Sequence, residues 1–134
     1  MDLKLFLKTL VETESPSHDK KAADKVGAIV AEEARRLGGQ VETIPNADAG
    51  DHVLARFPSS KGIGDKGEGE KPILLLCHMD TVFPLGTLSK MPYREAEGKI
   101  FGPGVLDMKA GIVIGLAGIE DALKRGMILP VTLL

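Results

Sequence analysis

The stretch that decides the fold is Pro72-Ile73-Leu74-Leu75-Leu76-Cys77-His78-Met79-Asp80-Thr81. Its first half is a continuous apolar run, which is typical of a central strand covered on both faces. Polar residues begin at His78, so His78 and Asp80 stand at the C-terminal end of the predicted strand. Because ligands gather at the C-terminal ends of strands in α/β sheets, this position is the first candidate for a functional site.

Helical and strand patterns alternate around this run. The patterns predict helices over residues 2–14, 15–37 and 108–125, and further strands over 41–44, 52–57 and 129–134. Ser15-Pro16 matches the N-cap and first position of the second helix, and Gly38-Gly39 matches its end. The alternation predicts an α/β layered domain with a largely parallel central sheet flanked by helices. The last strand reaches the final residue, so we expect a truncated domain.

Composition excludes several classes of partner. The chain has 134 residues, 43% hydrophobic and 27% charged, with a net charge of -2, so it offers no basic field for nucleic acid. The longest apolar run, Ala110–Ile119, is about half of the ~20 residues that cross a bilayer, so we expect no membrane span. Cys77 is the only cysteine. An intrachain disulfide is therefore excluded, and we expect a reducing, cytoplasmic location.

The pair His78 and Asp80 is the first candidate for chemistry. Side chains alternate along a strand, so both residues face the same side while Cys77 and Met79 point elsewhere. A neutral imidazole binds zinc through one nitrogen, and a carboxylate on the other nitrogen fixes its tautomer. Asp80 is the natural orienting group. Two residues are a weak pattern, so a surface histidine and aspartate near a turn is the alternative interpretation.

Asp107 is the second candidate, and it lies where the constrained loop Gly102-Pro103-Gly104 leads into a helix. A helix N-cap would by itself explain an aspartate at this place. A plain cap does not need a rigid loop, however, and a carboxylate held in this way could bridge two cations ~3.5–4 Å apart. Both interpretations stay open on the residues alone.

The remaining motifs are less informative. Residues 62–67 match the dinucleotide pattern G-x-G-x-x-G, but Pro72 and a predicted strand follow where a helix would be needed. His18 and His52 have no metal motif around them, so we interpret both as solvated. Cys77 is most simply a small buried apolar residue, because no base or redox partner is visible for it.

Taken together, Leu74–Val82 and Gly102–Gly111 resemble the zinc carboxypeptidase and deacylase family, which includes glutamate carboxypeptidase, acetylornithine deacetylase and succinyl-diaminopimelate desuccinylase. The resemblance implies that His78 ligates one zinc, that Asp107 bridges two, and that Asp80 is the catalytic-site residue that orients His78. It also implies a cis peptide bond between Asp107 and Met108. Ala110 stands where the family usually has glycine.

The same resemblance implies a function. It indicates a dinuclear zinc hydrolase, with cobalt or manganese as alternative metals, that cleaves amide or peptide bonds next to an amino acid. The segment His78–Thr87 is closer to the glutamate carboxypeptidase branch than to the deacetylase branch. The alternatives are an N-acyl amino acid deacylase of the same family and a non-catalytic truncated fragment. The substrate would be a small peptide or an N-acyl amino acid, and the parent enzyme could be a homodimer.

The family places further catalytic parts after the strand at Leu129. These are a Glu-Glu pair that supplies the general base and a zinc ligand, later ligands, and a small dimerisation domain. We therefore expect residues 1–134 to be the N-terminal part of the metal-dependent catalytic domain, without the dimerisation domain or the rest of the catalytic domain. On this interpretation the chain alone is inactive.

Overall fold

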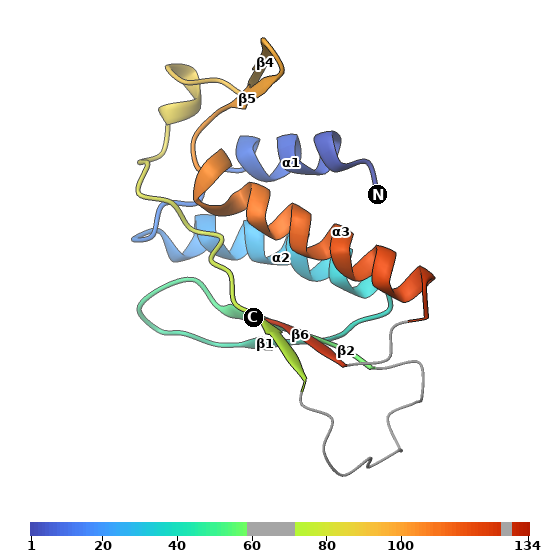
Figure 1. Cartoon of the computed structure of the whole chain (residues 1–134). Helices are drawn as coiled ribbons and strands as arrows, with labels where there is room; N and C mark the ends of the chain where they lie inside the picture. Colours follow the sequence, from blue (N-terminus) through green and yellow to red (C-terminus); the bar gives the residue numbers. More distant parts are fainter. Residues whose placement is uncertain (59–71, 127–129) are drawn as a thin grey trace.

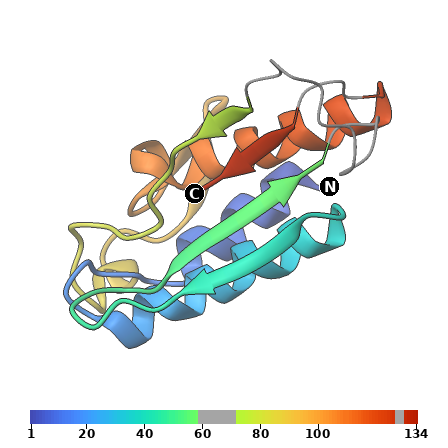
Figure 2. The ribbon, with the colours of Figure 1, turned by 90° about the horizontal axis from the view of Figure 1, so that it is seen from below.

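The computed structural model describes residues 1–58, 72–126 and 130–134. Within them, three α-helices lie on one side of a four-stranded sheet, and the view from below looks onto the other face of that sheet (Figures 1 and 2). This confirms the α/β layered fold. The G-x-G-x-x-G pattern at 62–67, the loop in which it falls and the expected strand start at Leu129 lie outside the described residues.

The helices begin where side chains satisfy their free amides. α1 spans Leu3–Glu12, and the Asp2 carboxylate accepts from the amide of Leu5. α2 spans Lys20–Arg36, and the Asp19 carboxylate accepts from the amide of Ala22. α3 spans Ala110–Lys124, within the predicted range. None of the helices in the described ranges is both long and apolar enough to cross a membrane.

The expected start of α2 at Ser15-Pro16 is wrong, and tertiary contacts are the reason. The Ser15 hydroxyl, which would cap a helix, donates instead to the carbonyl of Met79. Pro16 forms a parallel bridge with Thr81. Because these contacts hold the segment against another part of the chain, the helix is capped four residues later, by Asp19.

The sheet has the order β1-β2-β6-β3, from strands Gln40–Ile44, His52–Phe57, Val131–Leu133 and Ile73–Leu75. Only β3 and β6 pair in parallel among the described strands, and α3 lies between them in the chain. β1 pairs antiparallel with β2, and β2 with β6. The expectation of a largely parallel sheet is therefore wrong here. The seven-residue link from β1 to β2, 45–51, is shorter than the dozen or so residues of a parallel crossover.

β3 is an edge strand among the described strands, with β6 as its neighbour. Ile73 is 46% exposed and Leu74 is 58% exposed, so the predicted covering of both faces is not found. An apolar run indicates a strand that could be buried. Whether it is buried depends on the segments that pack beside it and over its faces, and these come from elsewhere in the chain. Beyond β3 the chain stays beside the end of β6, because the amide of Cys77 donates to the carbonyl of Leu134 at 2.7 Å. This hydrogen bond places His78 at the end of the sheet.

The core lies between the helices and the sheet. Its least exposed large side chains include Leu10 of α1, Val26 of α2, Phe57 of β2 and Leu116 of α3. Burial of each such side chain stabilises the fold by about 1.5–3 kcal/mol. All three helices and the sheet therefore share one core, which fixes the ends of β3 and α3 relative to each other. A separate hairpin, β4 (Arg94–Ala96) and β5 (Lys99–Phe101), follows a 3-10 turn at Thr87–Ser89.

Candidate metal centre

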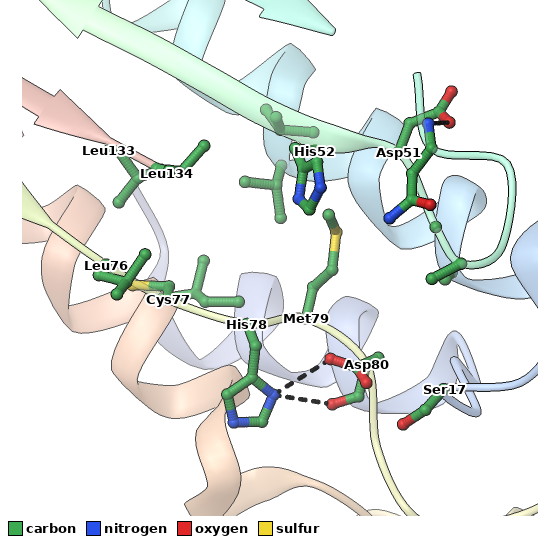
Figure 3. A pocket seen from close by; sticks show the side chains of 17 residues that line it. Ser17, Asp51, His52, Leu76, Cys77, His78, Met79, Asp80, Leu133 and Leu134 are labelled. Carbon is green, nitrogen blue, oxygen red and sulfur yellow. Dashed lines mark hydrogen bonds and ion pairs between the residues drawn. The ribbon is translucent and has the colours of Figure 1, made fainter. Parts of the chain in front are cut away.

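The segment after β3 presents its side chains alternately, as predicted. His78 and Asp80 point to the same side of the chain, whereas Met79 points to the opposite side, toward His52 (Figure 3). Successive side chains of an extended chain alternate in this way. The strand end therefore brings an imidazole and a carboxylate together.

Both ring nitrogens of His78 have carboxylate partners. Nδ1 lies 3.3 Å from Asp80 Oδ1 and 3.1 Å from the Asp80 carbonyl oxygen (Figure 3). Nε2 lies 2.9 Å from Asp107 Oδ1. Burial lowers the pKa of His78, but the hydrogen bond with Asp107 and the contacts with Asp80 outweigh it, so the pKa is raised above its ordinary value. The imidazole thus stands between two acidic side chains.

Asp107 reaches His78 from a tight turn, Val105–Lys109, that precedes α3. The Asp107–Met108 peptide bond is cis, which confirms the prediction. No side chain caps α3, which begins at Ala110. The cap interpretation of Asp107 is therefore wrong, because its carboxylate faces His78 instead of the helix amides.

The glycines before Asp107 let the turn approach the His78 segment. Gly104 has φ +71°, and a Cβ atom there would lie 2.4 Å from Thr81 Cγ2. Only a residue without a side chain tolerates both conditions. The loop Gly102-Pro103-Gly104 is therefore packed directly against Thr81, the residue that follows Asp80.

A cavity of about 330 Å³ contains the three candidates, His78, Asp80 and Asp107, together with Ser17 and Thr81. Imidazole nitrogen and carboxylate oxygen are ordinary zinc ligands, so the donor chemistry fits the metal that the resemblance implies. The parts of the chain that the structure describes hold no group of three or more His, Cys, Asp or Glu side chains arranged to bind a metal ion. His78, Asp80 and Asp107 thus lie close together without forming such a group by themselves.

A second cavity, of about 380 Å³, lies on the Met79 side of the same segment (Figure 3). His52, Cys77, Met79 and Leu133 are among its lining residues. His52 is exposed, as expected, and so is His18. Cys77 is only partly buried, and burial raises the pKa of its thiol, so it is not an activated nucleophile.

Sequence reasoning missed three polar residues around the centre. Lys109 is 1% exposed, and its Nζ donates to the carbonyls of Leu10 and Thr13 at 2.8 Å each. Burial lowers the pKa of Lys109 to about 8, against a smaller opposite effect of Glu14. Ser15 is fully buried. Lys109 could have been noticed in the sequence, because it lies between Asp107 and a strongly apolar helix. Nothing in the local sequence around Ser15 and Glu14 indicates that they lie near the centre.

A histidine between two aspartates, at the C-terminal edge of an α/β sheet, is the kind of site that metalloenzymes use. Residues 74–134 match the model of Peptidase family M20/M25/M40. Carboxypeptidase G2 from Pseudomonas sp. (strain RS-16) is 34% identical over 107 residues, which cover 78% of this chain and 24% of the relative. The chain thus spans about a quarter of the length of the curated relative that it matches.

Solved structures agree on the fold. The M20 family metallo-carboxypeptidase Sso-CP2 from Sulfolobus solfataricus matches with a TM-score of 0.79 at 18% identity, over 99% of this chain and 30% of that one. Human carnosine dipeptidase 1 matches with a TM-score of 0.78 at 16% identity, over 98% of this chain and 31% of that one. At these low sequence identities the two structures support the fold of this chain and nothing further.

Proposed function

We propose that this chain supplies a histidine ligand and a bridging carboxylate to a dinuclear zinc hydrolase with carboxypeptidase-like activity. The observation that carries the proposal is the 2.9 Å approach of His78 Nε2 to Asp107 Oδ1, with Nδ1 facing Asp80 on the other side. The 34% identity to a carboxypeptidase supports the choice of reaction. The substrate class is a small peptide or an N-acyl amino acid, cleaved at the amide bond next to the amino acid.

Each residue has a distinct role in this proposal. His78 would hold one zinc through Nε2, and Asp107 would bridge two zincs. Asp80 accepts from Nδ1, which fixes the neutral tautomer whose Nε2 lone pair is free to bind a metal. Zinc bound there supplies Lewis acidity toward the scissile carbonyl and lowers the pKa of water toward neutrality. Cobalt or manganese could serve the same donor set.

The number of ligands that zinc needs indicates which parts of the site this chain supplies. A catalytic zinc ordinarily has three protein ligands and an open position. We therefore assign the remaining ligands and the general base to polypeptide outside the described part of the chain, and we expect residues 1–134 alone to give no turnover from this site. A homodimeric parent in the cytoplasm remains part of the proposal.

The test uses the intact protein that contains this chain, stripped of metal with a chelator and titrated with zinc by calorimetry. We expect two zinc ions per subunit and hydrolysis of glutamyl peptides. His78→Ala should weaken zinc binding and remove turnover, whereas His18→Ala, which changes an exposed histidine elsewhere, should alter neither. Unchanged zinc affinity and turnover in His78→Ala would refute the proposal. Faster turnover of N-acyl amino acids than of peptides would move the assignment to the deacylase branch.

A further inference from the structure

The link between α1 and α2 contacts both segments that carry the candidate ligands. We call the first five residues of this link, Thr13–Ser17, the connector. The Ser15 hydroxyl donates to the carbonyl of Met79 at 2.7 Å, and the amide of Thr81 donates to the Ser15 carbonyl at 2.8 Å. The amide of Ser17 donates to the Thr81 carbonyl at 3.0 Å. The backbone on either side of Asp80 is therefore fixed by the connector.

Lys109 joins the connector to the other segment. Its Nζ donates to the carbonyls of Leu10 and Thr13 at 2.8 Å each, and its backbone amide donates to the carbonyl of Gly104 at 3.0 Å. The Leu10 carbonyl is one of the last four of α1, which have no partner within the helix and form the negative end of its dipole. The ammonium group therefore holds the turn that carries Asp107 against the end of α1.

The candidate ligands need such support because their own side chains are not packed. The side chain of His78 is 47% exposed and that of Asp107 is 85% exposed. Their separation is thus set by the two backbone segments, and these meet the same five-residue connector. A site functions when its supporting shell holds the ligands to within a fraction of an ångström.

We propose that Ser15 and Lys109 are positioning residues for the metal centre: through the connector they hold the His78–Asp80 segment and the Asp107 turn in register. This inference rests on the proposed function, because it takes His78 and Asp107 as metal ligands. Neither residue touches the ligands' reacting atoms. Each acts on the backbone that carries a ligand, Ser15 at Met79 and Lys109 two residues after Asp107.

The experiment measures zinc affinity by calorimetry and the visible spectrum of the cobalt-substituted form, in the intact protein. Lys109→Met keeps the side-chain length and removes the ammonium, and Ser15→Ala removes the hydroxyl. We expect each to weaken zinc binding by about 10-fold or more, as removal of outer-shell partners does, and to change the cobalt spectrum. Ser15→Thr restores a hydroxyl and should recover most of the affinity.

The matched control is Lys20→Met, because Lys20 also bridges two segments, through Asp24 and Asp51, and none of these three residues lines the cavity that contains Asp107. It should leave the zinc affinity and the cobalt spectrum unchanged. Circular dichroism checks that each variant is folded. If Lys109→Met does not fold, the comparison of Ser15→Ala with Ser15→Thr decides whether the connector positions the metal centre. Wild-type affinity and spectrum in folded Ser15→Ala would overturn the inference.

A His78→Ala variant in the same series separates the two proposals. If His78→Ala loses zinc while the Ser15 and Lys109 variants keep it, the positioning role is wrong and the metal centre stands. If His78→Ala keeps wild-type affinity, the metal centre itself is wrong, and the positioning role is refuted with it.

Discussion

Replacing Gly104 by alanine perturbs the contact between the two motif segments at one atom. The added Cβ would lie 2.4 Å from Thr81 Cγ2, whereas carbon atoms in favourable contact lie about 3.5–4.0 Å apart. Thr81 is 6% exposed, and its backbone is bound to Ser15 and Ser17 on both sides, so it has little room to move. The Asp107 turn must therefore shift away from the His78 segment.

Two effects add to the magnitude. The φ angle of +71° places alanine in the left-handed region, at a cost of roughly 1–2 kcal/mol. Forcing an extra methyl group against a packed neighbour costs typically about 1–3 kcal/mol. We expect Gly104→Ala to lower the free energy of unfolding by roughly 2–5 kcal/mol and to weaken zinc binding as well.

Two other glycines provide matched controls. Gly98, in the β4–β5 turn, has φ +70° but nothing within 4 Å of an added Cβ, so Gly98→Ala should show the backbone cost of roughly 1–2 kcal/mol alone. Gly118, exposed within α3, also has open space around it. Gly118→Ala should stabilise the protein by about 0.5–1 kcal/mol, because alanine favours a helix.

The assay is equilibrium unfolding in urea, with zinc calorimetry on the same samples of the intact protein. The order of stability should be Gly118→Ala, wild type, Gly98→Ala, Gly104→Ala. If Gly104→Ala is no less stable than Gly98→Ala and binds zinc as wild type does, then Thr81 yields to the methyl group and the reasoning about the contact is wrong.

Three further changes test other contacts. Asp80→Ala should weaken zinc binding or turnover by about 10–100-fold, and Asp48→Ala, at an exposed aspartate, should not; equal values would make Asp80 a surface residue. The Glu14 carboxylate accepts from the amides of Gly86 and Leu88, which hold its pKa below the ordinary 4.5. Its stabilisation is therefore present above pH 4.5 and lost as the pH falls through the lowered pKa, so urea midpoints of wild type and Glu14→Gln should converge in acid. A gap between the midpoints that is independent of pH would contradict this. Phe57→Ala empties a site that is 1% exposed and should cost about 3–5 kcal/mol in urea unfolding, and a loss below about 1 kcal/mol would place Phe57 outside the core.

The sequence was sufficient wherever the structure depends on local patterns. α3 falls inside its predicted range because its apolar period is unbroken from Ile112 to Leu123. His78 and Asp80 share a side because alternation is a property of the extended chain itself. The bounds of β2, His52–Phe57, were predicted without error because Pro58 ends the alternating run.

Non-local contacts account for the rest. Ser15 satisfies the local pattern of a helix cap, yet its hydroxyl is taken by a carbonyl 64 residues away. The edge position of β3 and the antiparallel pairings depend on which strands meet, which no single strand encodes. The approach of His78 to Asp107, 29 residues apart, followed from the family resemblance and not from spacing. The place of Lys109 between Asp107 and an apolar helix draws attention to it, but its burial depends on the end of α1, whose Leu10 carbonyl accepts from Nζ.

The bond from Lys109 to Leu10 joins residues 99 positions apart, and this has a consequence for biosynthesis. At ribosomal rates of 5–20 residues per second, roughly 5–20 s separate the appearance of Leu10 from that of Lys109. Throughout that interval α1 has neither the lysine nor α3 against which to place Leu7, Leu10 and Val11. Until Lys109 and α3 have been synthesised, the part of the nascent chain that already exists therefore carries an amphipathic helix with an uncovered apolar face, and such a face is prone to aggregation.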